Sequence, residues 1–375
     1  MFSLSGKGQE NVGDVIGAAI EYSGNYKLRT VTDDTEYHYF FAGINEENSE
    51  YHLRKGETFK TPALALTYSK EGLSGASRNF HKWGRKYILA HGNQERDILL
   101  NSWEGVYFGI NQQRMDQMMA DQSHMYIAYH EGFAKVIDRI RAKYKDVVIQ
   151  CCASGGGRAN WGFLRGFDEL WVSDNTDALQ RIYMQYGTSY FFPAIAMASH
   201  ISAVPNHTMF RTTSLKYRID VAMSGRLGME IQPKNMTDEE KAICKKAISE
   251  YKEIRPIVQF GDLYRLVSPF DNQGLSSIMY VSEAKDKAVF YWWKIANFHN
   301  VHLPRVKMAG LDANKMYKVR ELNAIDNKPL YCEGKSYSGR YLMDQGLEIP
   351  YIHSVSVNRD KKSDWSSRVI CLDAE

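Results

Sequence analysis

Residues 147–158, which decide the fold, read Val-Val-Ile-Gln-Cys-Cys-Ala-Ser-Gly-Gly-Gly-Arg. Here an apolar run ends in a glycine-rich turn, which is typical of a parallel strand covered on both faces. A second apolar strand is predicted at residues 169–172. Apolar residues also recur every three or four positions over residues 123–144, which predicts an amphipathic helix. This alternation of helix and strand predicts an α/β architecture with right-handed crossovers.

The same pattern continues on both sides of this stretch. Further strands are predicted at residues 98–108, 189–196 and 225–231, and a helix at residues 237–252. Short β-type runs precede this region, and no helix is expected there or after Pro256. After Pro256, short strands separated by turns are predicted at residues 277–281, 288–293, 305–311, 316–322 and 346–349. We therefore predict a multidomain chain with an N-terminal β-domain, an α/β domain and a C-terminal antiparallel β-sandwich, at residues 1–96, 97–255 and 256–375.

Charge, cysteine content and hydropathy exclude several classes of protein. The 47 Lys and Arg residues nearly balance the 44 Asp and Glu residues and form no basic stripe, so nucleic acid is not an expected partner. No run approaches the ~18 apolar residues of a membrane span, and residues 1–10 lack the order of a secretory signal, which favours a cytoplasmic location. The five cysteines form no Cys-x-x-Cys pair and are odd in number, so neither a zinc site nor a disulfide framework is indicated. No cofactor is expected.

Ligands of parallel α/β proteins bind beyond the carboxyl ends of the strands, so the loops after residues 152 and 172 are the candidate site. In the first loop, three consecutive glycines would let the main chain approach a ligand closely, although a tight turn explains them equally well. Arg158 follows these glycines, where its side chain could pair with a carboxylate.

The second loop, residues 173–177, places Asp174 and Asp177 three positions apart. One interpretation is a helix N-terminus capped by this segment. The other is that Asp174 faces the site as a general acid while Asp177 keeps the capping role. His200 and His207 have no third ligand at a suitable spacing, so no metal site is predicted, and no Gly-x-Ser-x-Gly elbow indicates a serine nucleophile.

Three segments carry a family resemblance: Cys-Ala-Ser-Gly-Gly-Gly-Arg at residues 152–158, Trp-Val-Ser-Asp-Asn-Thr-Asp at 171–177, and His-Ile-Ser-Ala-Val-Pro-Asn-His at 200–207. Together they resemble the α-galactosidases of glycoside hydrolase family 36. Shorter matching segments lie, in the family's order, at residues 22–25, 42–45, 101–104 and 255–262.

The resemblance implies an N-terminal β-domain, a central (β/α)8 TIM-type barrel and a C-terminal β-sandwich. It also implies retaining hydrolysis of terminal α-galactosyl residues in oligosaccharides such as raffinose and melibiose, so the expected partner is an α-galactoside sugar. Asp174 matches the general acid/base, and Cys152 and Gly155 match positions that touch galactose. Trp103 and Glu104 match the first barrel strand.

The chain departs from the family pattern before residue 124. Relatives carry there an Asp-Asp-Gly-Trp sugar-binding motif and a Lys-Trp-Asp motif with the nucleophile, whereas here Met-Met-Ala-Asp at 118–121 runs directly into Gln-Ser-His at 122–124. The N-terminal β-domain is also shorter than in the family. Moreover, about 155 residues hold five predicted strands, whereas a closed eight-unit barrel takes ~250.

The sequence therefore predicts an incomplete barrel that lacks three βα units and the nucleophile. Asp116, Asp121 and Glu104 are conceivable substitutes, but no pattern places any of them opposite Asp174. Three interpretations remain open: a glycoside hydrolase with little turnover, a non-catalytic galactoside-binding protein, and a deletion fragment. The last would expose strand edges and apolar faces and form homo-oligomers.

Overall fold

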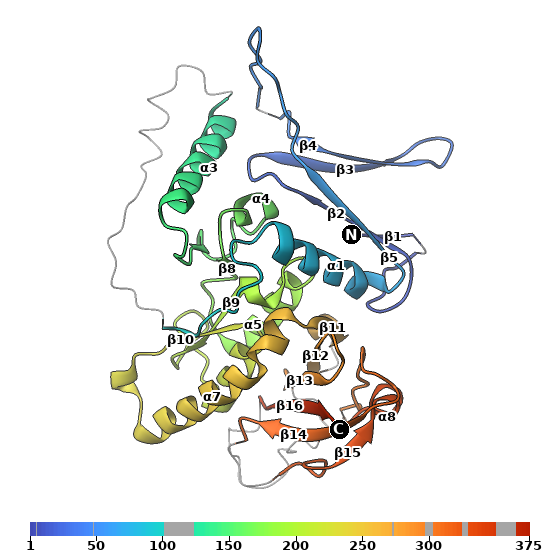
Figure 1. The fold of residues 1–375 in the computed structure, drawn as a ribbon, viewed down its shortest axis with the longest axis vertical. Coiled ribbons are helices and arrows are strands. Elements are labelled where there is room, and N and C mark those ends of the chain that lie inside the picture. Colours follow the sequence, from blue (N-terminus) through green and yellow to red (C-terminus); the bar gives the residue numbers. More distant parts are fainter. Residues whose placement is uncertain are drawn as a thin grey trace.

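The computed structural model describes residues 1–4, 6–47, 49–100, 124–271, 274–296, 303–324, 329–349 and 365–375. Figure 1 shows the N-terminal strands at the top, a parallel sheet with its helices in the middle, and an antiparallel sheet at the bottom. This arrangement follows the order predicted from the sequence and confirms the predicted fold class.

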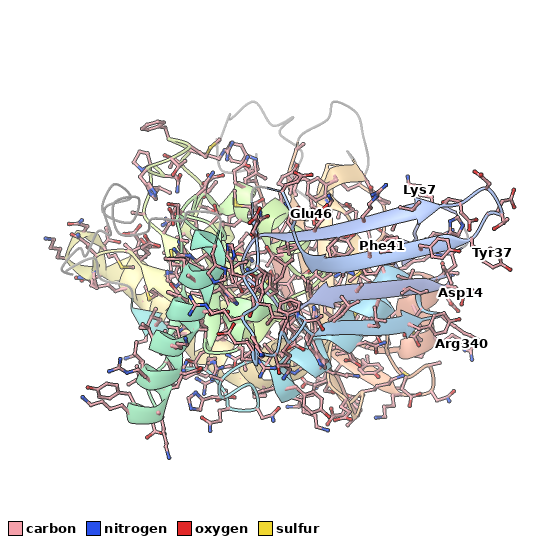
Figure 2. All side chains as sticks on the ribbon, turned by 90° about the horizontal axis from the view of Figure 1, so that it is seen from above. Lys7, Asp14, Tyr37, Phe41, Glu46 and Arg340 are labelled. Carbon is pink, nitrogen blue, oxygen red and sulfur yellow. The ribbon has the colours of Figure 1, made fainter. Side chains whose placement is uncertain are left out.

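The N-terminal part contains two small antiparallel sheets. One comprises β1 (Phe2–Ser3), β2 (Val15–Ile20) and β5 (Leu64–Ser69), and the other pairs β3 (Tyr26–Thr32) with β4 (His38–Ile44). Figure 2 shows the β3–β4 pair extending from the body, with the exposed side chains of Tyr37 and Phe41 on it.

The prediction that residues 1–96 contain no helix is wrong, because α1 spans Gly72–Tyr87. In the sequence, the glycines of this segment look like turn residues. In the structure, at least one of them allows close packing of the helix. A Cβ on Gly84 would lie 2.3 Å from the ring of Trp161, so glycine here lets the helix approach the barrel closely. On the same helix, Phe80 is buried and closes the space beside Gly17 of β2.

The middle sheet consists of five parallel strands: β6 (Leu99–Leu100), β7 (Gln150–Cys151), β8 (Glu169–Trp171), β9 (Met197–Ser202) and β10 (Arg226–Glu230). Their order in the sheet is β6-β10-β9-β8-β7. The first strand of the domain thus pairs with the last, which is how a (β/α) barrel closes. β6 and β7 follow each other in the described chain but lie at opposite ends of the sheet. Among the described residues the arc therefore holds five of eight barrel strands, with its opening between β6 and β7, which confirms the predicted incomplete barrel.

In the part of this domain that the structure describes, five helices accompany these strands: α3 (Met125–Lys143), α4 (Trp161–Leu164), α5 (Ala178–Thr188), α6 (Leu215–Ala222) and α7 (Asp238–Phe260). The prediction that α7 ends at residue 252 is wrong, since the helix continues through Pro256. The buried side chains of Ile254, Ile257 and Val258 hold this last part against the core, and their burial outweighs the lost backbone hydrogen bond.

The strand predicted at residues 189–196 is also wrong. Residues 194–196 form a 3₁₀ turn, and the strand is β9, which begins at Met197. His200, which the sequence suggests is a loop residue, therefore lies on a buried strand.

The C-terminal part is built on a six-stranded antiparallel sheet, ordered β11 (Asp262–Val267), β12 (Leu275–Val281), β13 (Lys287–Lys294), β16 (Ser367–Ala374), β14 (Met316–Leu322) and β15 (Ser336–Ser338). One face packs against the barrel, and the other packs against residues such as Val306, Leu342 and Leu347. Two predictions fail here. Segments 305–311 and 346–349 form only a Val306–Leu347 bridge among the described residues, and Gly339–Asp344 is a helix, α8.

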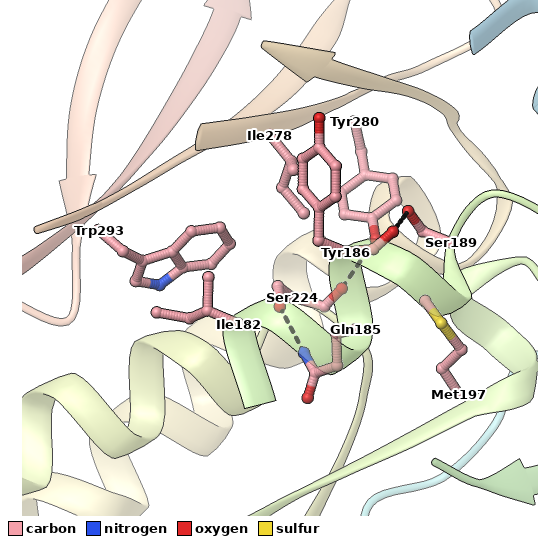
Figure 3. A pocket seen from close by; sticks show the side chains of 9 residues that line it. All are labelled: Ile182, Gln185, Tyr186, Ser189, Met197, Ser224, Ile278, Tyr280 and Trp293. Atoms are coloured by element: carbon pink, nitrogen blue, oxygen red, sulfur yellow. Dashed lines mark hydrogen bonds between the residues drawn. The ribbon is translucent and has the colours of Figure 1, made fainter. Parts of the chain in front are cut away.

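Side chains of α5 and of the C-terminal sheet meet in the contact drawn in Figure 3. Gln185 donates a 3.0 Å hydrogen bond to the hydroxyl of Ser224, whose carbonyl accepts one of 2.8 Å from Tyr280. The remaining cavity of about 10 Å³ has room for about one water molecule. This interface thus fixes α5, and the strand end before it, on a rigid support.

Candidate functional site

Asp174 lies three residues beyond the end of β8, at the carboxyl end of the parallel sheet. Its side chain is exposed, and its carboxylate accepts a 3.1 Å hydrogen bond from the indole N–H of buried Trp171. Strand β8 therefore positions Asp174, and its last residue, Trp171, orients the carboxylate through this hydrogen bond.

The glycine loop after β7 packs directly against the same segment. Gly155 has a φ of +79°, and a Cβ there would lie 2.7 Å from Ser173 Cα and 2.9 Å from the amide nitrogen of Asp174. Only glycine fits this position without displacing the acid-bearing loop. Cys152, exposed at the end of β7, begins the same loop. The structure thus assembles Cys152, Gly155 and Asp174, which the sequence singles out separately, at one end of the sheet.

Asp177 has a structural position. Its carboxylate accepts a 3.1 Å hydrogen bond from the backbone N–H of Gln180 and caps α5, and it also pairs with Arg211. The side chain is buried. The capping interpretation therefore applies to Asp177, and Asp174 is left to face outward.

Among the described residues, Arg158 contacts aromatic side chains, and no carboxylate pairs with it. Its guanidinium donates a 3.0 Å hydrogen bond to the hydroxyl of Tyr129 and lies 5.6 and 5.7 Å from the ring centres of Phe133 and Phe163. These aromatic residues come from α3 and α4, and they hold the arginine by ring contacts. Arg158 therefore fastens the glycine loop to α3.

Arg181 lies beneath the site, although the sequence analysis does not single it out. Its guanidinium is 4.6 Å from the centre of a Trp171 ring and donates hydrogen bonds of 3.3 and 2.7 Å to the carbonyls of Ser173 and Ala198. Burial lowers the pKa of Arg181 to about 10, with Glu230 and Asp174 acting in the opposite direction. The residue is thus a fixed cation at neutral pH, directly behind the ring that supports the acid.

His200 and Glu230 extend this support across the sheet. The rings of His200 and Trp171 are 4.5 Å apart, and His200 Nδ1 lies 3.4 Å from a carboxylate oxygen of Glu230. Gly228 makes room for the imidazole, because a Cβ there would lie 2.3 Å from it. Burial lowers the pKa of His200, which keeps the ring neutral. A period-two pattern of polar residues along β9 and β10 is the sequence signal that could have revealed this inward-facing set.

The described residues contain no cluster of three or more His, Cys, Asp or Glu side chains that could hold a metal. Nor do they include a helix that is long and apolar enough to cross a membrane. Trp103, Glu104, Asp116 and Asp121 lie outside the described residues. Among the described residues the site offers Asp174 as an outward-facing acid, whereas Glu230 is engaged by His200.

Parallel strands that carry an acid and a glycine loop at their carboxyl ends define the class of (β/α)-barrel enzymes. A family profile described as Melibiase matches residues 58–129 and 118–261, and the profile of the glycosyl hydrolase family 36 C-terminal domain matches residues 275–372. The chain therefore belongs to the Melibiase family, that is, to glycoside hydrolase family 36.

Individual relatives are similar to this chain in sequence, and one solved structure shares its fold. Alpha-galactosidase AgaA of Geobacillus stearothermophilus is 26% identical over 485 residues, which cover 91% of this chain and 65% of AgaA. Probable alpha-galactosidase C of Aspergillus terreus is 39% identical over 225 residues, covering 60% of this chain and 28% of the relative. The structure of an AgaA variant in complex with raffinose superposes with a TM-score of 0.85 at 24% identity, covering 99% of this chain and 68% of that one.

Length separates this chain from its relatives, since it spans about two thirds or less of those it matches. The alignment with AgaA is 485 positions long but contains only 91% of the 375 residues of this chain, so about 145 of its positions have no residue here. The two Melibiase matches meet at residues 118–129. A stretch of the relatives is therefore missing between β6 and β7, where the sheet is open.

Proposed function

We propose that this chain carries the proton-donating half of a retaining α-galactosidase site: it binds terminal α-galactosyl groups and, without the nucleophile, hydrolyses them very slowly. The observation that carries the proposal is the contact of Gly155 with the backbone of Ser173 and Asp174. It unites the predicted galactose-contacting loop with the predicted acid.

The family resemblance supplies the role proposed for each residue, and the geometry at the end of β8 supports it. Asp174, held by the Trp171 indole, would give its proton to the oxygen of the leaving group. Gly155 and Cys152 would line the galactose beside it. A retaining mechanism needs a second carboxyl group ~5 Å away to attack the anomeric carbon, and the family's nucleophile motif is absent from this chain. Loss of that group removes most of the rate enhancement while leaving sugar binding.

Titration calorimetry with raffinose tests this proposal. We expect millimolar binding that Asp174→Asn weakens, and no heat with sucrose, which lacks the galactosyl group. Asp286→Asn, a change in an exposed turn near the C-terminal sheet, is the control and should bind like the unaltered chain. If raffinose and sucrose give the same absence of heat, the proposal is wrong.

A further inference from the structure

The opening of the barrel has two unpaired strand edges. Among the described residues, β6 pairs only with β10 and β7 only with β8, so the outer edge of each has no partner strand. In a closed barrel these edges are joined through the intervening strands. Exposed edges present rows of N–H and C=O groups, which bind further strands readily.

A cavity of about 450 Å³ lies between the same two edges. Leu99 lines it from the side of β6, and Val148 and Gln150 line it from the side of β7. The cavity ends on Glu169 and Arg226, the first residues of β8 and β10. The cavity therefore lies at the amino ends of the strands, whereas Asp174 lies at their carboxyl ends. It leads into the interior of the barrel.

The inner wall of this cavity has polar groups that are incompletely matched. Arg226 Nε lies 2.8 Å from Glu169, which also accepts a 2.7 Å hydrogen bond from Gln150. Arg226 is buried, yet its Nη1 has no hydrogen-bond partner among the described residues. Buried donors of this kind are nearly always satisfied in folded proteins. A polypeptide that fills the opening should therefore place a hydrogen-bond acceptor beside Nη1 of Arg226.

The barrel geometry shows where that acceptor would come from. Each interior layer of an eight-stranded barrel takes four side chains from alternate strands. β8 and β10 are alternate strands and contribute Glu169 and Arg226, so two members of this layer are lacking. Three βα units amount to ~95 residues of a ~250-residue barrel, and the roughly 145 AgaA alignment positions without a residue in this chain are enough to hold them.

From these observations we infer that the opening between β6 and β7 is a binding surface for a second polypeptide of three βα units. This partner adds parallel strands to both edges and presents a hydrogen-bond acceptor to Arg226. The activity of the resulting complex rests on the proposed function, whereas the binding itself does not.

Co-expression of the full chain with the stretch of AgaA that has no counterpart here tests the inference. We expect the two polypeptides to co-purify as a 1:1 complex. Val148→Asp should weaken the complex at least 10-fold, because it puts a charge in the cavity wall. Val12→Asp should leave it unchanged, since Val12 is a similarly exposed valine in the N-terminal part. The complex should hydrolyse phenyl α-galactoside at least 100-fold faster than the chain alone.

Inserting the same AgaA stretch between Asp121 and Gln122 separates the outcomes. A complex without hydrolysis would confirm the surface and refute the proposed function. A single chain that folds and hydrolyses while the separate polypeptides do not associate would overturn the inference. A single chain that fails to fold would overturn it as well, because the opening would then not accept the stretch even when it is covalently joined.

Discussion

The indole N–H of Trp171 lies 3.1 Å from the carboxylate of Asp174 and donates a hydrogen bond to it at the end of β8. The same indole contacts His200 on one neighbour strand and Arg181 on the following helix. A buried aromatic side chain thus connects the outward-facing acid to the interior of the barrel. The orientation of Asp174 therefore depends on Trp171 and on the residues that pack against it.

Replacing Trp171 by Phe tests this connection. The phenyl ring keeps much of the packing but cannot donate to Asp174, so we expect raffinose binding to weaken about 5–10-fold, as for a lost hydrogen bond of ~1–1.5 kcal/mol. Calorimetry measures the affinity. Trp293→Phe is the matched control, since that buried indole N–H has no hydrogen-bond partner among the described residues. Equal losses in both variants would refute a specific role for the Trp171 donor.

Gly155→Ala should disable the site through the backbone. The added Cβ would meet Ser173 Cα at 2.7 Å in a left-handed conformation, so we expect a loss of about 1–3 kcal/mol in stability and no detectable binding of raffinose. Urea unfolding and calorimetry measure the two effects. Gly187→Ala lies in α5 with nothing within 4 Å of its Cβ, and it should bind normally. Normal binding by Gly155→Ala would show that this loop is not part of the site.

Asp177→Ala should affect stability more than binding. The change removes the cap of α5 and the partner of Arg211, so we expect the free energy of unfolding to fall by about 1–2 kcal/mol. Asp177→Ser keeps a capping oxygen and should recover part of the loss. Thermal unfolding gives the order of the three chains. A large loss of binding in the Ser variant would instead place Asp177 in the site.

Structural features that depend on a short local pattern could be predicted from the sequence. Features that depend on how strands align in the sheet could not. The apolar run before Cys152 and the capping role of Asp177 are local, and both were predictable. The position of β9 was not, because the apolar residues 191–196 resemble a strand more than the polar segment around His200 does. The contacts of His200 with Trp171 and Glu230 arise only when three strands align, so no single segment encodes them.

Buried histidines predict a pH dependence of stability. Burial and nearby Arg85 lower the pKa of His81 well below its usual value, and Nε2 of this residue lies 2.8 Å from the carbonyl of Ser189. The unfolded chain therefore binds the proton first, near pH 6.5, and the free energy of unfolding should fall as the pH drops from 7.5 to 5. Urea unfolding at both pH values measures the difference.

The His81→Gln variant isolates this effect, because it removes the titrating group. We expect its stability to change less between pH 7.5 and 5 than that of the unaltered chain. His38→Gln, at an exposed position on β4, should retain the full change. An identical pH dependence in all three chains would exclude His81 as the cause.

The central claim is that the site keeps its proton donor and lacks its nucleophile, and chemical rescue with azide tests it most directly. Phenyl α-galactoside has a poor leaving group and needs the Asp174 proton, while azide can attack the anomeric carbon in place of the missing carboxylate. We predict almost no turnover without azide, formation of β-galactosyl azide and phenol at molar azide, and loss of both products in Asp174→Asn. Rapid hydrolysis without azide, with release of α-galactose, would contradict the claim by showing that a second carboxylate is in place.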